Sequence, residues 1–302
     1  MEFVLFDVDE NLRETTQHGS EEFPVAIYLQ ELLRNREGCV ILHWHNEVQF
    51  IIVKRGTVEY RVDQQCYLLH PGQALFINSK CLHMARPSGG ENAAYICIDV
   101  HPRFLGGYGG RVSRNYVTPL LASKTLSAII LDGEEDWQKQ SMALLNHIVE
   151  IYEVQPFAWE LTLQQMFLAL WELLLLSHQQ ALEDTDAATI AEQERLEAVL
   201  AFIHTHFAER VTLEDIASAA SISPGECCRF FKRMLRVSPM SYLNQFRIVQ
   251  STSLLSGTAL SVAEIAHQVG FSSSSYFTAR FKQMMNCRPL EYRSRFGLKQ
   301  KQ

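Results

Sequence analysis

Histidines gather with carboxyl and carboxamide side chains in a short segment of the N-terminal half. If this segment is a β-strand, alternate residues share one face. The alternate residues are His43, His45, Glu47 and Gln49. A third histidine, His83, follows a Pro71-Gly72 turn. Neutral imidazole binds divalent transition metals and also hydrogen-bonds small organic molecules. The residue types therefore predict a site for a metal ion or for a small-molecule effector.

Short β-rich segments, separated by turn residues along residues 38–101, must position these side chains. The segments are Val40–Leu42, Val48–Lys54, Val58–Val62, Ala74–Ile77 and Ala94–Val100. Strands of this length and spacing are typical of an all-β barrel or sandwich. The His-x-His segment, the later turn and the third histidine resemble the pattern of the cupin fold, which implies a small β-barrel.

The resemblance to cupins leaves three interpretations of the site. In metal-binding cupins such histidines hold a divalent ion, which would make ligands of His43, His45 and His83. Glu47 or Gln49 would supply the further ligand, but Gln49 stands where metal cupins commonly have a carboxylate, and a carboxamide is a poorer ligand. We therefore expect no metal or other cofactor and favour side chains that hydrogen-bond an effector. Purely structural histidines are the third interpretation.

Aromatic residues in the same region suggest what kind of effector binds. They are Trp44, Tyr60, Tyr67 and Tyr95. Aromatic rings are suited to stack on a sugar or an aromatic compound, but the same residue types also fill protein cores. We assign Trp44 and Tyr95 to the effector site and keep the core role as the alternative.

Helical patterns replace the β pattern from about Trp137. An apolar stripe that ends near Tyr152 predicts a helix terminated by Pro156. The next helix, from about Trp159 to His178, is apolar over most of its girth, which indicates either burial within the subunit or a subunit interface. Residues 181–191 are polar and predict a linker.

The C-terminal third contains the same pattern twice. Leu213, Ile216, Ala217, Ala220 and Ile222 recur 49 residues later as Val262, Ile265, Ala266, Val269 and Phe271. Phe231-Lys232, Pro239, Tyr242 and Phe246 recur 50 residues later. Each copy predicts a helix-turn-helix unit, whose second helix enters the DNA major groove. We interpret the change of offset as lying inside these second helices.

A long helix between the two units sets their spacing. It begins at Ser238-Pro239, continues to Leu255 and stops at Gly257. At about 1.5 Å per residue it spans roughly 26 Å. A spacer of this length would hold two recognition helices about one DNA turn, roughly 34 Å, apart.

Capping residues and charges identify candidate DNA contacts in the first unit. Thr212 with Asp215 caps its first helix, and Ser223 caps the second. The candidates for base contacts are Gly225, Cys228 and Arg229. The fork of Arg229 matches two acceptors on guanine. The candidates for phosphate contacts are Ser223, Lys232 and Arg233.

The second unit predicts a different surface. Ser261 with Glu264 caps its first helix, Gly270 ends that helix in a left-handed conformation, and Ser272 caps the recognition helix. The candidates for base contacts are Ser274, Ser275, Thr278 and Arg280. The candidates for phosphate contacts are Ser272 and Lys282.

Residues 190–297, and above all GFSSSSYFTARFKQMMNCRPLEYR, resemble the signature of the AraC/XylS family of bacterial transcription regulators. The resemblance implies a double helix-turn-helix domain that binds double-stranded DNA, an effector-binding barrel, and RNA polymerase as a partner. Two positions depart from the family pattern. Asn286 replaces a usual glycine but still tolerates a left-handed conformation, and Ala279 stands where arginine is common, with Arg280 beside it.

Charge is divided unevenly between the two halves. Residues 1–198 carry 14 Lys and Arg against 28 Asp and Glu, a net of −14, whereas residues 199–302 carry 13 against 6, a net of +7. A basic C-terminal module attracts phosphates. Seven cysteines without regular spacing, no signal-peptide pattern and no membrane-spanning apolar run predict a cytoplasmic protein with reduced thiols.

These patterns predict an α+β multidomain protein with four segments. They are a cupin-like sensing barrel (1–125), a helical dimerisation or packing segment (126–180), a linker (181–191) and a double helix-turn-helix domain (192–302). We expect a homodimeric, non-enzymatic transcription regulator controlled by a small-molecule effector such as a sugar. Two alternatives are a metal-dependent cupin enzyme fused to a DNA-binding module and a constitutive DNA-binding protein whose barrel only dimerises.

Overall fold

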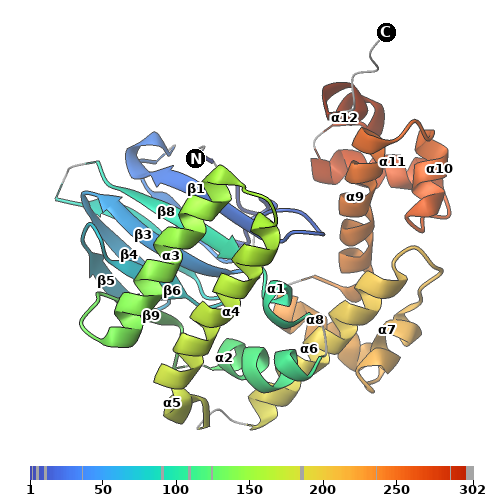
Figure 1. Cartoon of the computed structure of the whole chain (residues 1–302). Coiled ribbons are helices and arrows are strands. Elements are labelled where there is room, and N and C mark those ends of the chain that lie inside the picture. The colour runs from blue at the N-terminus through green and yellow to red at the C-terminus, as the bar shows by residue number, and fades with distance from the viewer. Residues whose placement is uncertain are drawn as a thin grey trace. The chain divides into compact units, whose positions relative to one another are not determined.

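The computed structural model describes residues 1–296 except 2, 5, 6, 10, 11, 36, 90, 91, 108, 109, 124, 184–186, 236 and 286. The chain divides into two compact units, Met1–Gln193 and Glu194–Gln302 (Figure 1). Within the described part of the chain, no helix has both the length and the apolarity needed to cross a membrane.

The first unit is built on two antiparallel sheets, as the all-β prediction requires. The five-stranded sheet has the order β1 (Val25–Glu31), β8 (Ala94–Val100), β3 (Val48–Arg55), β6 (Ala74–Ile77) and β9 (Ala128–Leu131). The four-stranded sheet has the order β2 (Val40–His43), β7 (His83–Ser88), β4 (Thr57–Val62) and β5 (Gln65–Leu69). The predicted fold class, an N-terminal β domain followed by an all-helical domain, is confirmed.

Alternation along the central strands separates two cores. Phe50 and Ile52 of β3 lie on the outer face of the five-stranded sheet and pack with helices. Ile51 and Val53 of the same strand face inward and pack with Tyr60 of the four-stranded sheet. From Val48 to Val53 both faces of β3 are buried, and this part of the strand is apolar except for Gln49.

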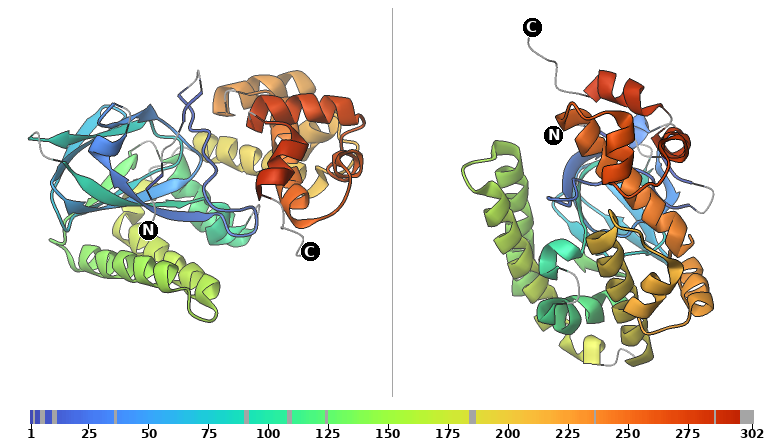
Figure 2. Two further views of the ribbon diagram at one scale, coloured as in Figure 1. Left: turned by 90° about the horizontal axis from the view of Figure 1, so that it is seen from above. Right: turned by 90° about the vertical axis from the view of Figure 1, so that its right-hand side faces the viewer.

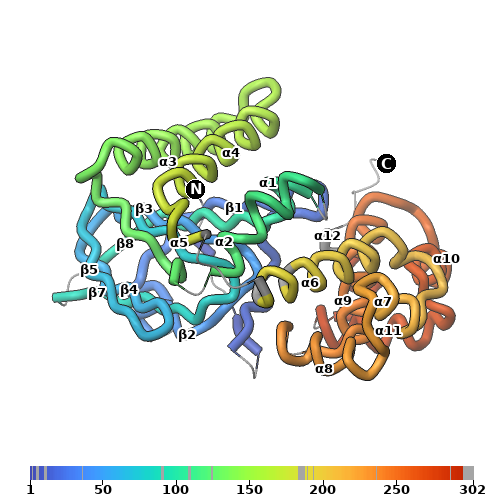
Figure 3. Tube along the Cα trace, turned by 90° about the horizontal axis from the view of Figure 1, so that it is seen from below, coloured from blue at the N-terminus to red at the C-terminus, as the bar shows by residue number. Residues whose placement is uncertain are grey.

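Two antiparallel helices cover the outer face of the five-stranded sheet (Figures 2 and 3). They are α3 (Asp136–Val154) and α4 (Trp159–Ser177). Leu163, Phe167 and Leu170 of α4 are buried against the sheet. One side of the apolar helix α4 therefore packs within the subunit, while its other side leaves leucines exposed.

Short helical segments complete the first unit. They are η1 (Leu32–Arg34), α1 (Arg103–Gly106), the π-helical turn η2 (Ser113–Val117), α2 (Thr118–Ala122) and α5 (Gln179–Glu183). The first of them follows β1 directly, and α1 and α2 add Phe104 and Leu120 to the core under α4.

Two of the predicted boundaries are wrong. The segment expected to be helical from residue 126 begins with β9, which pairs with β6 at the edge of the sheet; four residues are too few to show an alternating pattern. Most of the predicted linker is helical, since α6 runs from Ala187 to His206. The physical reason is that Gln, Glu and Ala favour helices. Residues 184–186 of that linker lie outside the described residues.

The second unit consists of helices, as predicted. After α6 follow α7 (Leu213–Ala219), α8 (Pro224–Leu235), α9 (Pro239–Gly257), α10 (Val262–Gln268), α11 (Ser274–Met285) and α12 (Pro289–Phe296). Helix α9 contacts both helix-turn-helix pairs, α7–α8 and α10–α11 (Figure 1). Ser238 caps α9 with Pro239 at its first position, so the predicted start and the predicted stop near Gly257 are both correct.

The turns of the two units have the same backbone conformation but different residues. Gly270 adopts φ +88° and Ser221, 49 residues earlier, adopts φ +55°. A Cβ on Gly270 would lie 2.4 Å from the carbonyl oxygen of Phe207 and 2.9 Å from the Arg247 guanidinium. Glycine is therefore required in the second turn by close packing as well as by conformation, whereas the first turn accommodates an exposed serine.

We predict that Gly270→Ala lowers the free energy of unfolding of the C-terminal unit by roughly 2 to 4 kcal/mol, because it adds backbone strain and a clash with main-chain atoms. Gly257→Ala is the matched control, since nothing lies within 4 Å of its added Cβ. Urea unfolding of the full chain measures both. Equal stability of the two variants would contradict the role assigned to Gly270.

Candidate functional site

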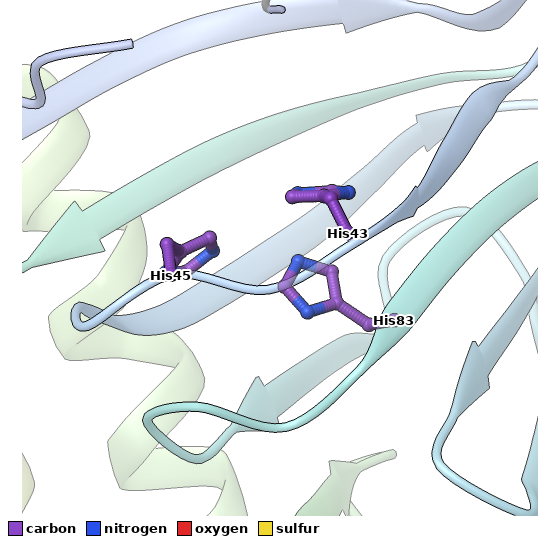
Figure 4. Close-up of side chains that lie close together, drawn as sticks. All are labelled: His43, His45 and His83. Carbon is purple, nitrogen blue, oxygen red and sulfur yellow. The ribbon is translucent and has the colours of Figure 1, made fainter. Parts of the chain in front are cut away.

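Three histidines meet between the two sheets of the first unit. His43 ends β2 and pairs across the sheet with His83, the first residue of β7, and His45 follows in the bend after β2. Their ring centroids are 4.1 Å apart for His43 and His83, 4.9 Å for His45 and His83, and 5.7 Å for His43 and His45 (Figure 4). All three are buried. The structure thus brings together the three histidines singled out in the sequence.

Main-chain carbonyls fix the orientation of each ring. The Nδ1 atoms of His43, His45 and His83 lie 2.8, 3.1 and 2.9 Å from the carbonyl oxygens of residues 41, 47 and 81. A carbonyl oxygen only accepts, so each Nδ1 carries the proton and donates it. In the neutral ring Nε2 then holds a lone pair, and the Nε2 atoms of His45 and His83 are buried without a hydrogen-bond partner among the described residues.

Burial keeps these rings neutral. Desolvation lowers the pKa of His43, His45 and His83, and the neighbouring rings lower the pKa of His43 and His45 further, because two imidazolium ions repel each other. Neutral imidazoles with free lone pairs are the form that binds a metal ion or accepts a hydrogen bond.

A fourth histidine nearby is charged. His18 places Nδ1 3.2 Å from Asp99 Oδ2 and Nε2 3.1 Å from Glu14 Oε2. Burial lowers the pKa of His18, but the carboxylates of Asp99 and Glu14 outweigh that effect and raise its pKa to about 10. His18 is therefore a buried cation held between two carboxylates.

Asp99 is also the centre of a hydrogen-bond network that crosses the barrel. The Tyr28 hydroxyl donates to Asp99 Oδ2 at 2.6 Å, and Gln49 Nε2 donates to Asp99 Oδ1 at 2.9 Å. Gln49 Oε1 in turn accepts from the Tyr60 hydroxyl of the opposite sheet at 2.5 Å. Both ends of the Gln49 amide are thus engaged, so Gln49 supports the site and is not a free ligand.

The other predicted effector residues lie at different distances from the cluster. Tyr95 is buried in the same interior, with its ring centroid 5.9 Å from that of Tyr60. Glu47 Oε2 is 3.6 Å from His45 Nδ1, and burial raises the pKa of Glu47. The Trp44 ring instead contacts the Arg13 guanidinium, 5.7 Å from the ring centroid.

The expectation that residues 43–49 form one strand is wrong. β2 ends at His43, and β3 begins at Val48 in the other sheet. The bend between them moves His43 and Gln49 into different sheets. Because both inner faces enclose the same interior, the side chains still converge there.

Three important residues are absent from the sequence predictions. Glu14 and His18 lie in an N-terminal segment without periodicity, so no sequence pattern identifies them. Asp99 does carry a signal, because a carboxylate within an otherwise apolar and fully buried strand needs a partner.

The recognition helix of the first unit, α8, presents the predicted residues to solvent. Phe230, Phe231 and Cys227 are buried. The opposite surface is formed by exposed Gly225, Arg229, Lys232 and Arg233, with Cys228 half-buried and Ser223 exposed at the start of the helix. Arg233 lies over the Phe230 ring, 5.7 Å from its centroid. Arg229 is exposed on this surface, and among the described residues its guanidinium makes no ion pair or ring contact.

The recognition helix of the second unit, α11, has a different surface. Ser272, Ser274, Ser275 and Lys282 are exposed, and Thr278 is half-buried. Arg280 donates from Nε to the Tyr276 hydroxyl at 3.0 Å and from Nη1 to Gln283 Oε1 at 2.9 Å. Exposed Ala279 occupies the position that corresponds to Arg229, 50 residues earlier. Tyr276, which the sequence did not single out, therefore shares this surface with Arg280.

The assignment of Ser272 as the helix cap is wrong. The amide of Tyr276 donates to the Ser273 hydroxyl at 3.3 Å, and α11 begins at Ser274. Ser273 thus corresponds to Ser223, and Ser272 is the extra residue that changes the offset from 49 to 50. The extra residue lies in the turn, so the two recognition helices match each other throughout their length. Asn286 lies outside the described residues.

Part of the positive charge of this unit has a structural role. Arg247 is buried and donates to the carbonyl oxygens of Phe207 and Glu209 at 2.7 and 2.8 Å. Arg293 donates to the carbonyl oxygen of Leu255 at 3.2 Å and to that of Leu260. These arginines satisfy carbonyls at helix ends, so fewer cations remain to contact phosphates than the net charge indicates.

Two family models match the chain. An AraC-like ligand binding domain covers residues 24–200, more than half of the chain, and a helix-turn-helix domain covers residues 216–295. The first contains the histidine cluster, and the second contains both recognition helices.

Relatives extend over most of the chain. It is 35% identical over 288 residues to the HTH-type transcriptional regulator YdeC of Bacillus subtilis (strain 168), with 95% of this chain and 98% of that protein covered. It is 26% identical over 266 residues to the HTH-type transcriptional activator RhaS of Enterobacter sp. (strain 638), covering 83% and 86%. A crystal structure of ToxT from Vibrio cholerae O395 matches with 15% identity and a TM-score of 0.45, covering 90% and 97%. The chain belongs to the AraC family of transcription regulators, with an N-terminal ligand-binding domain and a C-terminal helix-turn-helix DNA-binding domain.

Proposed function

We propose that this regulator senses its ligand at the buried histidine cluster and reads DNA chiefly through α8. The observation that carries the first part is the pair of buried Nε2 atoms on His45 and His83 that lack hydrogen-bond partners among the described residues. Leaving a buried acceptor unsatisfied costs about 1 to 3 kcal/mol, so a ligand that satisfies both gains that free energy.

The ligand controls DNA binding or activation through a shift between two arrangements of the regulator. Such a shift requires that the ligand bind one arrangement more tightly than the other. A small hydrogen-bonding metabolite, such as a sugar, fits the polar groups of Glu47 and Tyr95 around the histidines. If the barrel only dimerised, it would bind no such ligand. The family assignment favours a regulator over the second alternative, a metal-dependent cupin enzyme.

The ligand proposal predicts that a sugar or small metabolite raises the thermal unfolding temperature of the full chain. At a ligand concentration 100 times Kd the stabilisation is about 2.7 kcal/mol. Differential scanning fluorimetry across a metabolite panel measures it, and His45→Gln should abolish the shift. A panel in which every hit shifts wild type and His45→Gln equally would contradict the site.

Helix α8 is the stronger candidate for base recognition. Arg229 stands exposed among Gly225 and half-buried Cys228, so its guanidinium can reach a base edge. In α11, Ala279 replaces that arginine and Arg280 is bound to Tyr276 and Gln283 of its own helix. Ser274, Ser275 and Thr278 remain for base contacts there, and Ser272 and Lys282 for phosphates.

We predict that Arg229→Ala weakens binding to the operator by roughly 1 to 3 kcal/mol and relaxes the preference at one base pair. Arg233→Ala is the matched control, since a phosphate contact should weaken binding uniformly across sequences. Competition binding against a library of single-base operator variants measures both effects. An unchanged base preference in Arg229→Ala would overturn this assignment.

The proposal includes a homodimer formed through α3 and α4. Phe157 between these helices is 102% exposed, and Leu161 and Leu176 of α4 are 69% and 67% exposed. Leu168 of α4 is exposed on the same helix. An apolar surface of this kind on the outer side of the ligand-binding domain is suited to a second copy of the same surface. We also expect contact with RNA polymerase at the promoter and action in the cytoplasm, where the DNA is found.

Leu161→Glu should shift the protein from dimer to monomer, because it places a charge in the apolar contact. Leu68→Glu on β5 is the matched control, since Leu68 is a similarly exposed leucine on another surface. Analytical ultracentrifugation at several concentrations measures the dissociation constant. A dimer weakened equally by both changes, or by neither, argues against this interface.

A further inference from the structure

We infer that His43, His45, His83 and Glu14 bind one divalent transition-metal ion inside the barrel. This inference deepens the proposed function and rests on it, since it adds a metal ion to the histidine cluster at which the effector is proposed to bind. The ion would lie among the three rings, which each offer one nitrogen within 4.8 Å of the other two.

The protonation pattern of the rings is the first support. The Nδ1–H groups of the three histidines donate hydrogen bonds to the main-chain carbonyls of residues 41, 47 and 81. In each neutral ring the lone pair is therefore on Nε2. Metal-binding histidines show this arrangement, because the second ring nitrogen donates to a fixed acceptor and so orients the ring. No protein hydrogen bond among the described residues uses the Nε2 atoms of His45 and His83.

Distance is the second support. One ring nitrogen from each of the three histidines lies within 4.8 Å of those of the other two. Three nitrogens bound to one tetrahedral ion at about 2.0–2.1 Å lie about 3.4 Å apart. Contraction of this size requires only small rotations of side chains, and the 4.1 Å separation of the His43 and His83 rings already places two of them close together.

Glu14 supplies the carboxylate ligand that is missing on β3, where Gln49 occupies the expected position. Its Oε2 lies 3.6 Å from His43 Nε2, so a carboxylate oxygen and a ring nitrogen that holds a lone pair face each other. A cation between these two atoms would attract both. Glu14 Oε1 is also buried without a hydrogen-bond partner in the described structure. A carboxylate therefore approaches the cluster from the N-terminal segment, although Gln49 occupies the expected position on the strand.

Charge around the site favours a cation. Two acidic side chains, Glu14 and Asp99, lie beside the cluster. Asp99 Oδ1 lies 3.9 Å from His45 Nε2. Carboxyl oxygens thus lie beside the ring nitrogens of His43 and His45, as a bound cation requires.

The donor set selects the class of metal. Imidazole nitrogens suit zinc, iron, nickel and copper, whereas calcium and magnesium prefer sites made of oxygen atoms. Three histidines with one carboxylate therefore fit a transition metal, and Zn²⁺ is a suitable probe because it has no redox chemistry of its own.

The test is titration of chelator-treated full-length protein with Zn²⁺ by isothermal calorimetry, with metal analysis of the dialysed complex. We expect one equivalent per chain. His83→Gln should lower the affinity on the order of 100-fold, and Glu14→Gln roughly 10-fold. His70→Ala is the matched control, because His70 is an exposed histidine of the same unit. Because His83 is fully buried, His45→Gln provides a second variant, and far-UV circular dichroism without metal checks that each variant folds.

Loss of binding in His83→Gln or His45→Gln, with binding retained in His70→Ala, supports the site. Absence of saturable binding in the wild type, or undiminished binding in both folded variants, overturns it. Undiminished affinity in Glu14→Gln alone overturns the role of Glu14. None of these readouts involves DNA or an organic effector. If the protein binds no Zn²⁺ but a metabolite still raises its unfolding temperature in a way that depends on His45, the metal site is overturned and the proposed function stands.

Discussion

The ion pairs of buried His18 with Asp99 and Glu14 are the interaction on which the barrel interior depends. They fasten an N-terminal segment without regular periodicity to the inner face of the five-stranded sheet. Removing one partner would leave a buried charge uncompensated, which costs about 3 to 5 kcal/mol. The segment is therefore held in place by electrostatics, and it brings Glu14 to the histidines.

The strands that carry this polar network also carry the apolar core beneath the helices. On β3, Gln49 faces the network while Phe50 packs under α3 and α4; on β8, Asp99 and Ile98 divide in the same way. A ligand bound inside thus acts on strands whose opposite faces support the proposed dimer surface. This continuity gives a physical route by which an event between the sheets can reach the outer helices, because packed interiors transmit displacement.

The two helix-turn-helix units show how one scaffold is used for two surfaces. Their capping boxes, turns and buried phenylalanines correspond, and Ser272 is the added residue. The difference lies in exposed positions, with Arg229 in one unit and Ala279 in the other. Because exposed residues contribute little to folding, such positions are free to differ according to the DNA sequence that each unit meets.

The sequence by itself determined the elements that rest on local periodicity and capping. The double helix-turn-helix, the long helix from Pro239 and the left-handed turn at Gly270 follow from apolar spacing, the caps Thr212 and Ser261, and the glycine itself. The three histidines could also be identified, since residue type and a β-rich context suffice.

Only the tertiary structure decided which groups join those histidines. The bend after His43 separates β2 from β3, the ends of the Gln49 amide are taken by Tyr60 and Asp99, and Glu14 enters from a distant segment. These contacts join residues far apart in the chain through buried charge and hydrogen bonding. No local pattern encodes them, because the free energy that selects them arises only when both sheets close around the same interior.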